Sequence, residues 1–338
     1  MKGVGFCKPL PITEPDSLLD VELPDPAAPS GHDLLVQVKA VSVNPVDAKM
    51  RVRRTPKDGG IEVLGWDAAG VVLATGAEAQ LFKVGDEVYY AGSIDRPGSY
   101  AEQQLVDERI VGRKPTTLNF AEAAALPLTS ITAWELLFDR LCVQRGDKSN
   151  GETLLIVGAA GGVGSILTQL ARQLTGLTVI GTASRPKTKE WVRSLGAHHV
   201  IDHSQSLTDE LRHIGLPQVS YVAGLTHTPD HFAEIADALA PQGKFALIDN
   251  LGESDLGLLR NKSISLHWEY MFTRPLFATP DMIAQHNLLD ELADLVEAGT
   301  IRTTLAEHHG AINAANLKRA HALIESGKAR GKIVLEGW

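Results

Sequence analysis

The sequence has only two cysteines, Cys7 and Cys142, among its 338 residues. So few thiols exclude a scaffold held together by disulfides, and because no C-x-x-C pair is present, a thiolate zinc site is excluded too. The two cysteines could pair, but free thiols in a reducing compartment are the usual state of so cysteine-poor a chain. We therefore expect a cytoplasmic protein.

Long hydrophobic runs and an excess of positive charge are also missing. No apolar stretch approaches the roughly 18 residues of a transmembrane helix, and the N-terminus lacks the basic and apolar regions of a secretory signal. The net charge of −9 argues against nucleic-acid and membrane partners, since both reward positive surfaces. With 44% hydrophobic and 22% charged residues, the chain is a globular protein long enough for two domains.

The pattern changes along the chain. The first 120 residues predict short strands separated by proline and glycine, which indicates a compact β-barrel. Further on, apolar runs alternate with helical segments, which predicts right-handed crossovers and a parallel sheet. Strands are expected at 153–159, 178–183, 198–202, 219–225 and 243–249, and helices near 162–174, 187–195, 206–213 and 230–239. A last short strand at 331–335 is expected to return to the first domain.

The most informative stretch joins the first of these later strands to its helix. The apolar run Leu154–Val157 ends in a cluster of small residues. Within this cluster, Ala159, Gly161 and Gly164 have the spacing of the G-x-G-x-x-G dinucleotide fingerprint, with alanine in the first place. Small residues let the backbone approach a pyrophosphate, and the start of the following helix offers amide groups to bind it. We expect cofactor phosphates at Ala159, Gly161, Gly162, Val163 and Gly164.

Other motifs accompany this turn in a fixed order: NPVDAKMR at 44–51, LGWDAAG at 64–70, GDEV at 85–88, GSYAE at 98–102, AALPLT at 124–129 and GKIVL at 331–335. With them the chain resembles the medium-chain dehydrogenase/reductase superfamily. Within it, the chain is similar to the zinc-independent quinone oxidoreductase branch, in a subgroup often labelled "zinc-type alcohol dehydrogenase-like". The resemblance implies an α/β fold, with a Rossmann doubly wound parallel sheet and a GroES-like β-barrel catalytic domain. It implies the catalytic domain at 1–128, the NADP-binding domain at 129–275 and a return to the catalytic domain at 276–338.

The departures from the family pattern concern the metal. The resemblance implies that zinc-dependent members have cysteine in place of Asn44, a His-Glu pair in place of Trp66 and Asp67, and a further cysteine near Leu126–Ser130. Zinc requires thiolate, imidazole or carboxylate groups that converge on it, and neither Asn44 nor Trp66 supplies one. We expect no bound metal, and we expect Trp66 to fill the vacated cavity.

The end of the second Rossmann strand indicates which cofactor binds. NAD-selective folds place an acidic residue there for the ribose 2′-hydroxyl group, whereas this chain has Ser184 and Arg185, with Lys189 close behind. A carboxylate would repel a 2′-phosphate, while these side chains can donate to it, so the pattern favours NADPH. The alternative is that these residues only form the solvated start of a helix and bind no cofactor.

The resemblance implies three further cofactor contacts. It places His203, where related reductases often have tyrosine, near the adenosine phosphate, and it places Thr129 and Thr132 against the nicotinamide ribose and carboxamide. A surface histidine and a helix-capping Thr129 are the alternatives.

Without a metal, hydride transfer suits acceptors that are already electrophilic. Quinones and alkenes conjugated to a carbonyl group qualify, because their product anions are delocalised. We expect Asn44 to polarise the acceptor oxygen, unless it only closes a turn before Pro45. Lys49 is the second catalytic candidate, as a cation or proton donor, although better-known quinone reductases have a tyrosine there.

The run at 265–274 is rich in aromatic residues in a chain with only 5% of them. It could form a subunit interface, a wall of the substrate pocket, or both, because alternate side chains of a strand point to opposite faces. We expect most of it in the interface of a homodimer, and Met271 and Phe272 in the substrate pocket with Trp66. The sequence thus predicts an NADPH-dependent reductase of quinones or enones. A zinc-dependent alcohol dehydrogenase and a non-catalytic NADPH-binding redox sensor are the alternatives.

Overall fold

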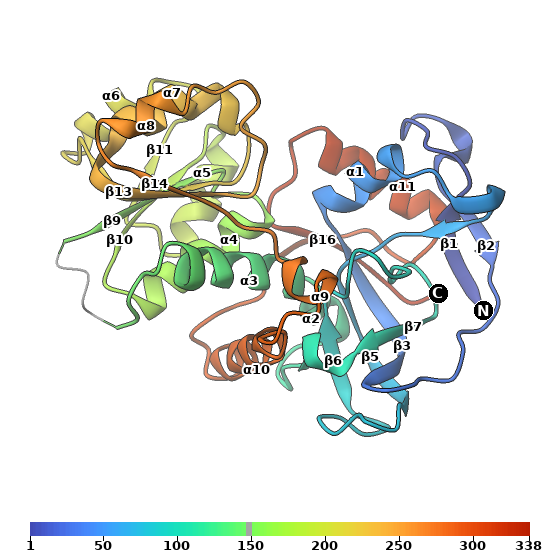
Figure 1. Cartoon of the computed structure of the whole chain (residues 1–338). Helices are drawn as coiled ribbons and strands as arrows, with labels where there is room; N and C mark the ends of the chain where they lie inside the picture. The colour runs from blue at the N-terminus through green and yellow to red at the C-terminus, as the bar shows by residue number, and fades with distance from the viewer. Residues whose placement is uncertain (147–150) are drawn as a thin grey trace. The chain divides into compact units, whose positions relative to one another are not determined.

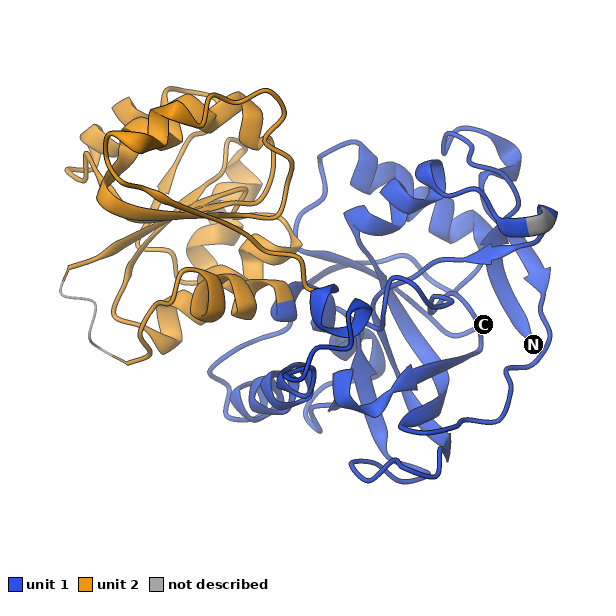
Figure 2. Ribbon diagram, in the orientation of Figure 1, with its two compact units in different colours: residues 1–131, 272–338 blue, residues 132–271 orange. Residues whose placement is uncertain are grey.

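The computed structural model describes residues 1–146 and 151–338. The chain divides into two compact units, residues 1–131 with 272–338 and residues 132–271 (Figure 2). The sequence predicts domain borders after residues 128 and 275, and the structure divides after residues 131 and 271. Among the described residues, no helix has both the length and the apolar character needed to cross a membrane.

The second unit is built on a parallel sheet of six strands in the order β11-β10-β9-β12-β13-β14. Its strands are β9 (Thr153–Val157), β10 (Thr178–Thr182), β11 (His199–Ile201), β12 (Val219–Gly224), β13 (Leu239–Leu247) and β14 (Ser265–Trp268). The chain enters at the middle and winds outward in both directions, which is the doubly wound order of dinucleotide-binding folds. All five residues of β9 are buried, as expected of a strand covered on both faces. The predicted Rossmann sheet is confirmed.

Helices cover both faces of this sheet. They are α4 (Gly162–Leu174), α5 (Pro186–Ser194), α6 (Leu207–His213), α7 (Thr228–Ala238) and the short α8 (Gly257–Arg260). Figure 1 shows α6, α7 and α8 together on one face and α4 on the other. Between one helix layer and the sheet lies an apolar core in which Leu155, Val222, Phe232 and Phe245 are almost fully buried. A π-helical stretch, Glu135–Arg140, also belongs to this unit.

The first unit is a mainly antiparallel, barrel-like arrangement centred on one long strand, in which only the described pair formed by the last two strands of the chain is parallel. This strand is β3 (Asp33–Val43), and it pairs with β5 (Ala68–Thr75), β7 (Gln103–Asp107) and β16 (Lys332–Glu336). The sheet continues through β6 (Glu87–Tyr90), β8 (Val111–Arg113) and β15 (Leu305–His308), and a second sheet joins β2 (Leu19–Glu22), β1 (Lys2–Phe6) and β4 (Glu62–Val63). Because β16 pairs with β3, the C-terminal strand returns to the first unit as predicted.

The first unit also contains helices. They are α1 (Pro45–Arg53), α2 (Phe120–Ala124), α9 (Thr273–Leu276), α10 (Ala284–Glu297) and α11 (Ala314–Glu325), with short 3-10 turns at Pro15–Ser17, Lys57–Gly59 and Glu108–Ile110. The helix α3 (Pro127–Trp134) contains the division point between the two units. Asn44 directly follows β3 and is the N-cap of α1, and Lys332 begins β16, so the pairing of these two strands brings distant chain positions together.

Candidate functional site

The glycine-rich turn after β9 is shaped for close backbone approach. Gly158 has a φ of +91°, a conformation that side chains disfavour. A Cβ atom at Gly164 would lie 2.4 Å from the carbonyl oxygen of Gly158 and 2.6 Å from Cα of Ala159, so α4 packs directly on the turn. A Cβ atom at Gly161 would meet nothing closer than 3.5 Å, so space remains beside this residue. The turn therefore fits a pyrophosphate group.

The predicted phosphate-binding residues come together at the start of α4. Gly162, Val163 and Gly164 form its first turn, where amide groups have no carbonyl partner within the helix and the helix dipole favours an anion. Ala159 is fully buried beneath the turn. These residues can hold the phosphates of a dinucleotide cofactor.

A threonine that the sequence analysis overlooked links this turn to the neighbouring strands. Thr182, the last residue of β10, accepts a hydrogen bond at its Oγ1 from the Gly158 amide at 3.0 Å. The same hydroxyl lies 3.2 Å from Nδ1 of His203, which follows β11. The glycine turn, the end of β10 and His203 therefore lie together at the carboxyl ends of the parallel strands, which we call the carboxyl edge of the sheet. Ser184 and Arg185 lie at the same edge.

The cations at this edge differ in their surroundings. Arg185 is exposed at the start of α5. Lys189 forms an ion pair with Asp202 at 2.8 Å. Although partial burial opposes ionisation, the hydrogen bonds from Lys189 and Ser204 lower the pKa of Asp202 to about 2. The charge of Lys189 is thus balanced by a carboxylate that the sequence analysis did not consider.

The two threonines predicted near the nicotinamide lie on α3. Thr129 is 2% exposed and donates from its Oγ1 to the carbonyl oxygen of Leu126 at 3.2 Å. Thr132 is likewise buried. The division point falls between them, so Thr129 belongs to the first unit and Thr132 to the second.

The first unit contains a buried polar group of Asn44, Asp67 and Lys332, which we call the Lys332 cluster. These side chains are only 1%, 0% and 2% exposed. The Lys332 ammonium group donates to Asp67 Oδ2 at 2.9 Å, to the carbonyl oxygen of Val43 at 3.2 Å and to Oδ1 of Asn44. Three acceptors match the three hydrogens of an ammonium group, so the cation is fully satisfied inside the protein.

The amide of Asn44 is turned toward this cluster. Its Nδ2 donates to Asp67 Oδ2 at 2.8 Å and, with longer bonds, to the carbonyl oxygens of Trp66 at 3.3 Å and Ser42 at 3.4 Å. Its backbone amide donates to Asp47 Oδ2 at 2.6 Å, which fixes the start of α1. One hydrogen of the Asn44 side-chain amide thus forms a short bond to Asp67. The other hydrogen forms only the two longer bonds to the Trp66 and Ser42 carbonyl oxygens.

The cluster and its surroundings contain two carboxylates and one ammonium group. Burial raises the pKa of Asp47 to about 7, against the hydrogen bond from the Asn44 backbone and the charge of Lys332. Burial also raises the pKa of Asp67, and Lys332 is the strongest opposing influence. Since burying a charge is costly unless it is paired, Lys332 is what allows a carboxylate to remain at this depth.

Trp66 and Phe272, both predicted in the substrate pocket, are in contact. Their rings meet edge to face with centroids 6.1 Å apart. Trp66 is fully buried and donates from its indole nitrogen to the carbonyl oxygen of Ser93 at 3.1 Å. Met271 is also buried but belongs to the second unit, and Lys49 is exposed on α1.

The residues at the expected metal position do not form a zinc site. Asn44 and Trp66 offer an amide and an indole, and Asp67, the one carboxylate of the Lys332 cluster, is already bound to a cation that would repel Zn²⁺. Nor do the residues that the structure describes include any group of three or more His, Cys, Asp and Glu side chains able to hold a metal ion.

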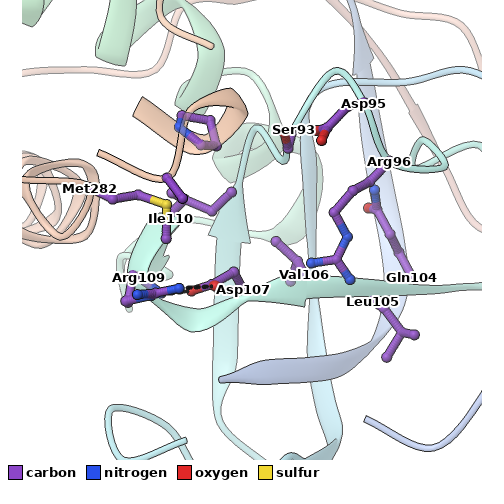
Figure 3. A pocket seen from close by; sticks show the side chains of 12 residues that line it. Ser93, Asp95, Arg96, Gln104, Leu105, Val106, Asp107, Arg109, Ile110 and Met282 are labelled. Atoms are coloured by element: carbon purple, nitrogen blue, oxygen red, sulfur yellow. Dashed lines mark hydrogen bonds and ion pairs between the residues drawn. The ribbon is translucent and has the colours of Figure 1, made fainter. Parts of the chain in front are cut away.

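Two pockets of the first unit are lined by other residues. In the one shown in Figure 3, with a volume of about 100 Å³, Arg109 forms an ion pair with Asp107 at 2.7 Å, and Arg96 reaches Asp33 at 2.8 Å. The larger one, of about 870 Å³, has apolar walls and contains the ion pair of Arg54 with Glu62 at 2.6 Å. No predicted site residue lines either pocket.

Comparison with known proteins agrees with this architecture. Residues 30–116 match the family model of the alcohol dehydrogenase GroES-like domain, and residues 195–335 match that of the zinc-binding dehydrogenase. The chain is 40% identical to a zinc-type alcohol dehydrogenase-like protein of Staphylococcus aureus, over 99% of both chains.

Solved structures extend the comparison. A protein of Rhizobium etli described as a zinc-dependent alcohol dehydrogenase is 61% identical, with a TM-score of 0.96 over 100% of this chain and 98% of that one. The quinone oxidoreductase of Escherichia coli, solved with NADPH, is 26% identical, with a TM-score of 0.84 over 99% of this chain and 100% of that one. The predicted GroES-like domain is confirmed. This chain therefore belongs to the medium-chain dehydrogenase/reductase superfamily and is an oxidoreductase with a nicotinamide cofactor.

Proposed function

We propose that this protein is a metal-independent, NADPH-dependent reductase of quinones or alkenes conjugated to a carbonyl group. The observation that carries the proposal is the Lys332 cluster, because an internal ion pair stands where zinc-dependent members would hold their metal. A bound nicotinamide supplies the hydride. An acceptor that is reduced without a metal must need little polarisation, which favours quinones and enones over simple ketones.

The preference for NADPH is supported by the end of β10. Ser184 and the exposed Arg185 can both donate to a 2′-phosphate, and no carboxylate stands at the position that would select a 2′-hydroxyl group. Asp202, the nearby carboxylate, is held by Lys189. We assign further cofactor contacts to His203, Thr129 and Thr132.

Asn44 and Lys49 are the proposed contacts of the acceptor oxygen. The amide hydrogen of Asn44 that faces Trp66 and Ser42 has only long bonds of 3.3 and 3.4 Å, so it is the one that an acceptor oxygen could take over. Lys49, exposed in the middle of α1, is the proposed cation or proton donor. Trp66 and Phe272, whose rings are in contact, would form an apolar wall that excludes water, and Met271 is a further proposed contact of the acceptor.

The proposal includes a homodimer in a reducing compartment such as the cytoplasm. An edge strand of the six-stranded sheet is β14. Trp268, its last residue, is 56% exposed, and Tyr270, which follows it, is 47% exposed. An open sheet edge with exposed aromatic side chains is a ready surface for pairing with a second copy. Both cysteines are free. Sedimentation should give twice the monomer mass, and Trp268→Lys should lower it.

The function is tested by following NADPH oxidation with quinones, enones and the matching saturated ketones, together with metal analysis of the purified protein. Turnover with quinones or enones is expected, unchanged by a chelator. Lys49→Met should lower kcat without changing the Kd of NADPH, whereas Lys83→Met, at an exposed surface position, should change neither. Stoichiometric zinc with alcohol oxidation would identify an alcohol dehydrogenase, and tight NADPH binding without any turnover would identify a redox sensor.

A further inference from the structure

Three histidines gather at the edge of the parallel sheet where the adenosine end of the cofactor is proposed to bind. His203 follows β11, His227 directly precedes α7, and His231 lies in the first turn of α7. The ring centroids of His203 and His231 are 6.3 Å apart. None of the predicted roles includes His227 or His231, because they are more than 20 residues from His203 and only the fold brings them close.

Two threonines tie this group to the glycine turn. Thr182 bonds to both the Gly158 amide and His203, as described above. On the other side, the hydroxyl of Thr226 lies 2.8 Å from Nδ1 of His227, and its methyl group would lie 2.8 Å from a Cβ atom at Gly158. The histidines are therefore anchored beside the phosphate-binding turn, at the same edge as Arg185.

The surroundings of His203 lower the pKa of its imidazole. Burial is the main cause that lowers its pKa, followed by His231, while His227 and Arg185 act in the same direction. Asp202 acts in the opposite direction and favours the charged form, and its carboxylate also binds Lys189 and Ser204. In the ligand-free protein, His231, His227 and Arg185 thus all disfavour a positive charge on His203, and a bound anion would offset their effect.

We propose that His203 and His231, with His227 beside them, bind the 2′-phosphate group of NADPH in their protonated form, so that NADPH binding takes up protons. The inference rests on the proposed use of NADPH. A phosphate dianion within about 4–6 Å of an imidazole favours its charged form, whereas the 2′-hydroxyl group of NADH carries no charge and gives no such coupling. Selectivity for NADPH over NADH should therefore increase as the pH falls.

The expected size of the effect follows from linkage. If the charge of the phosphate couples to each protonated imidazole, each histidine should strengthen NADPH binding severalfold between pH 8.5 and pH 6.5, and the pair about tenfold. This window lies above the second pKa of the phosphate itself, about 6, below which the phosphate would lose charge and weaken the effect.

The test measures the Kd of NADPH and of NADH by fluorescence titration at pH 8.5, 7.5 and 6.5, with calorimetry in buffers of different ionisation enthalpy to count protons. For the native protein, the Kd of NADPH should fall about tenfold across this range and that of NADH less than twofold. His203→Gln and His231→Gln should each remove about half of the slope, and the double variant should remove it. His213→Gln is the matched control, because the His213 side chain is 78% exposed. His203→Lys, with a fixed charge, should bind NADPH more tightly than His203→Gln at pH 8.5.

Unchanged NADH binding by each variant shows that the fold is intact. Equal pH slopes for NADPH and NADH in the native protein, or a slope that persists in the double variant, would overturn the inference even where NADPH remains preferred at pH 8.5. A chain that binds NADH as tightly as NADPH at every pH would instead overturn the proposed cofactor itself, and this inference with it.

Discussion

Replacing Lys332 with methionine tests the buried ion pair on which the proposed function rests. The substitution keeps the length of the side chain and removes its ammonium group, so Asp67 loses its counter-charge while fully buried. Asp67 would keep the hydrogen bonds from the Asn44 amide and the Leu128 backbone, both at 2.8 Å. The loss is therefore that of a charge partner, with two hydrogen-bond donors still in place.

Removing one partner of a buried ion pair costs about 3–5 kcal/mol, and the two remaining donors place this variant near the lower end. About 3 kcal/mol is a large share of a typical folding free energy of about 5–15 kcal/mol. Urea denaturation at pH 7 should show this loss for Lys332→Met and less than about 0.5 kcal/mol for Lys8→Met at an exposed position. The double variant with Asp67→Asn should recover about 2 kcal/mol, since no unpaired charge is left buried.

The pH dependence has a definite sign. Without Lys332, burial raises the pKa of Asp67 against only the hydrogen bonds from Leu128 and Asn44, so the folded state binds a proton more tightly than the unfolded state does. A carboxyl group of this kind destabilises the fold increasingly as the pH rises above its unfolded pKa of about 4. The deficit of Lys332→Met should thus shrink between pH 7 and pH 5. Additive losses in the double variant, or a deficit independent of pH, would refute the reasoning.

Three further predictions concern other parts of the molecule. Gly164→Ala should lower the free energy of unfolding by about 1–3 kcal/mol and abolish tight cofactor binding, because its Cβ would lie 2.4 Å from the carbonyl oxygen of Gly158. Gly161→Ala should keep the native melting temperature and weaken only cofactor binding. Equal melting temperatures for the two variants would contradict the packing argument. Arg185→Asp should raise the Kd of NADPH about tenfold to a hundredfold and spare NADH, as measured by titration, and equal losses for both cofactors would remove Arg185 from the 2′-phosphate contact. Glu297→Gln removes a carboxylate whose pKa the Thr116 backbone and Arg113 lower to about 2. The ionised Glu297 stabilises the native fold above its unfolded pKa of about 4.3, and this stabilisation is lost toward pH 2. The stability deficit of Glu297→Gln in urea denaturation should therefore shrink from pH 5 to pH 3. A deficit that stays constant over this range would contradict the argument.

Much of the second unit follows from the local sequence. The alternation of apolar runs with helical segments determines a parallel sheet, because strands covered on both faces need helical crossovers. The glycine turn is equally local, since Gly164 packs against Gly158 and Ala159, and Gly158 has a positive φ of +91°. The absence of an acidic residue at the end of β10 could likewise be recognised from the sequence, because the position is fixed by the strand that precedes it.

The tertiary structure decided the pairings between distant residues. Lys332 meets Asn44 across 288 positions because β16 pairs with β3 in one antiparallel register, and no local pattern fixes a register between strands so far apart. The sequence motifs contained both residues but gave Lys332 no role. His231 meets His203 for a similar reason, since α7 and the end of β11 come together only when the sheet is complete. Side-chain charge states at these positions depend on burial and neighbours, which are properties of the folded chain alone.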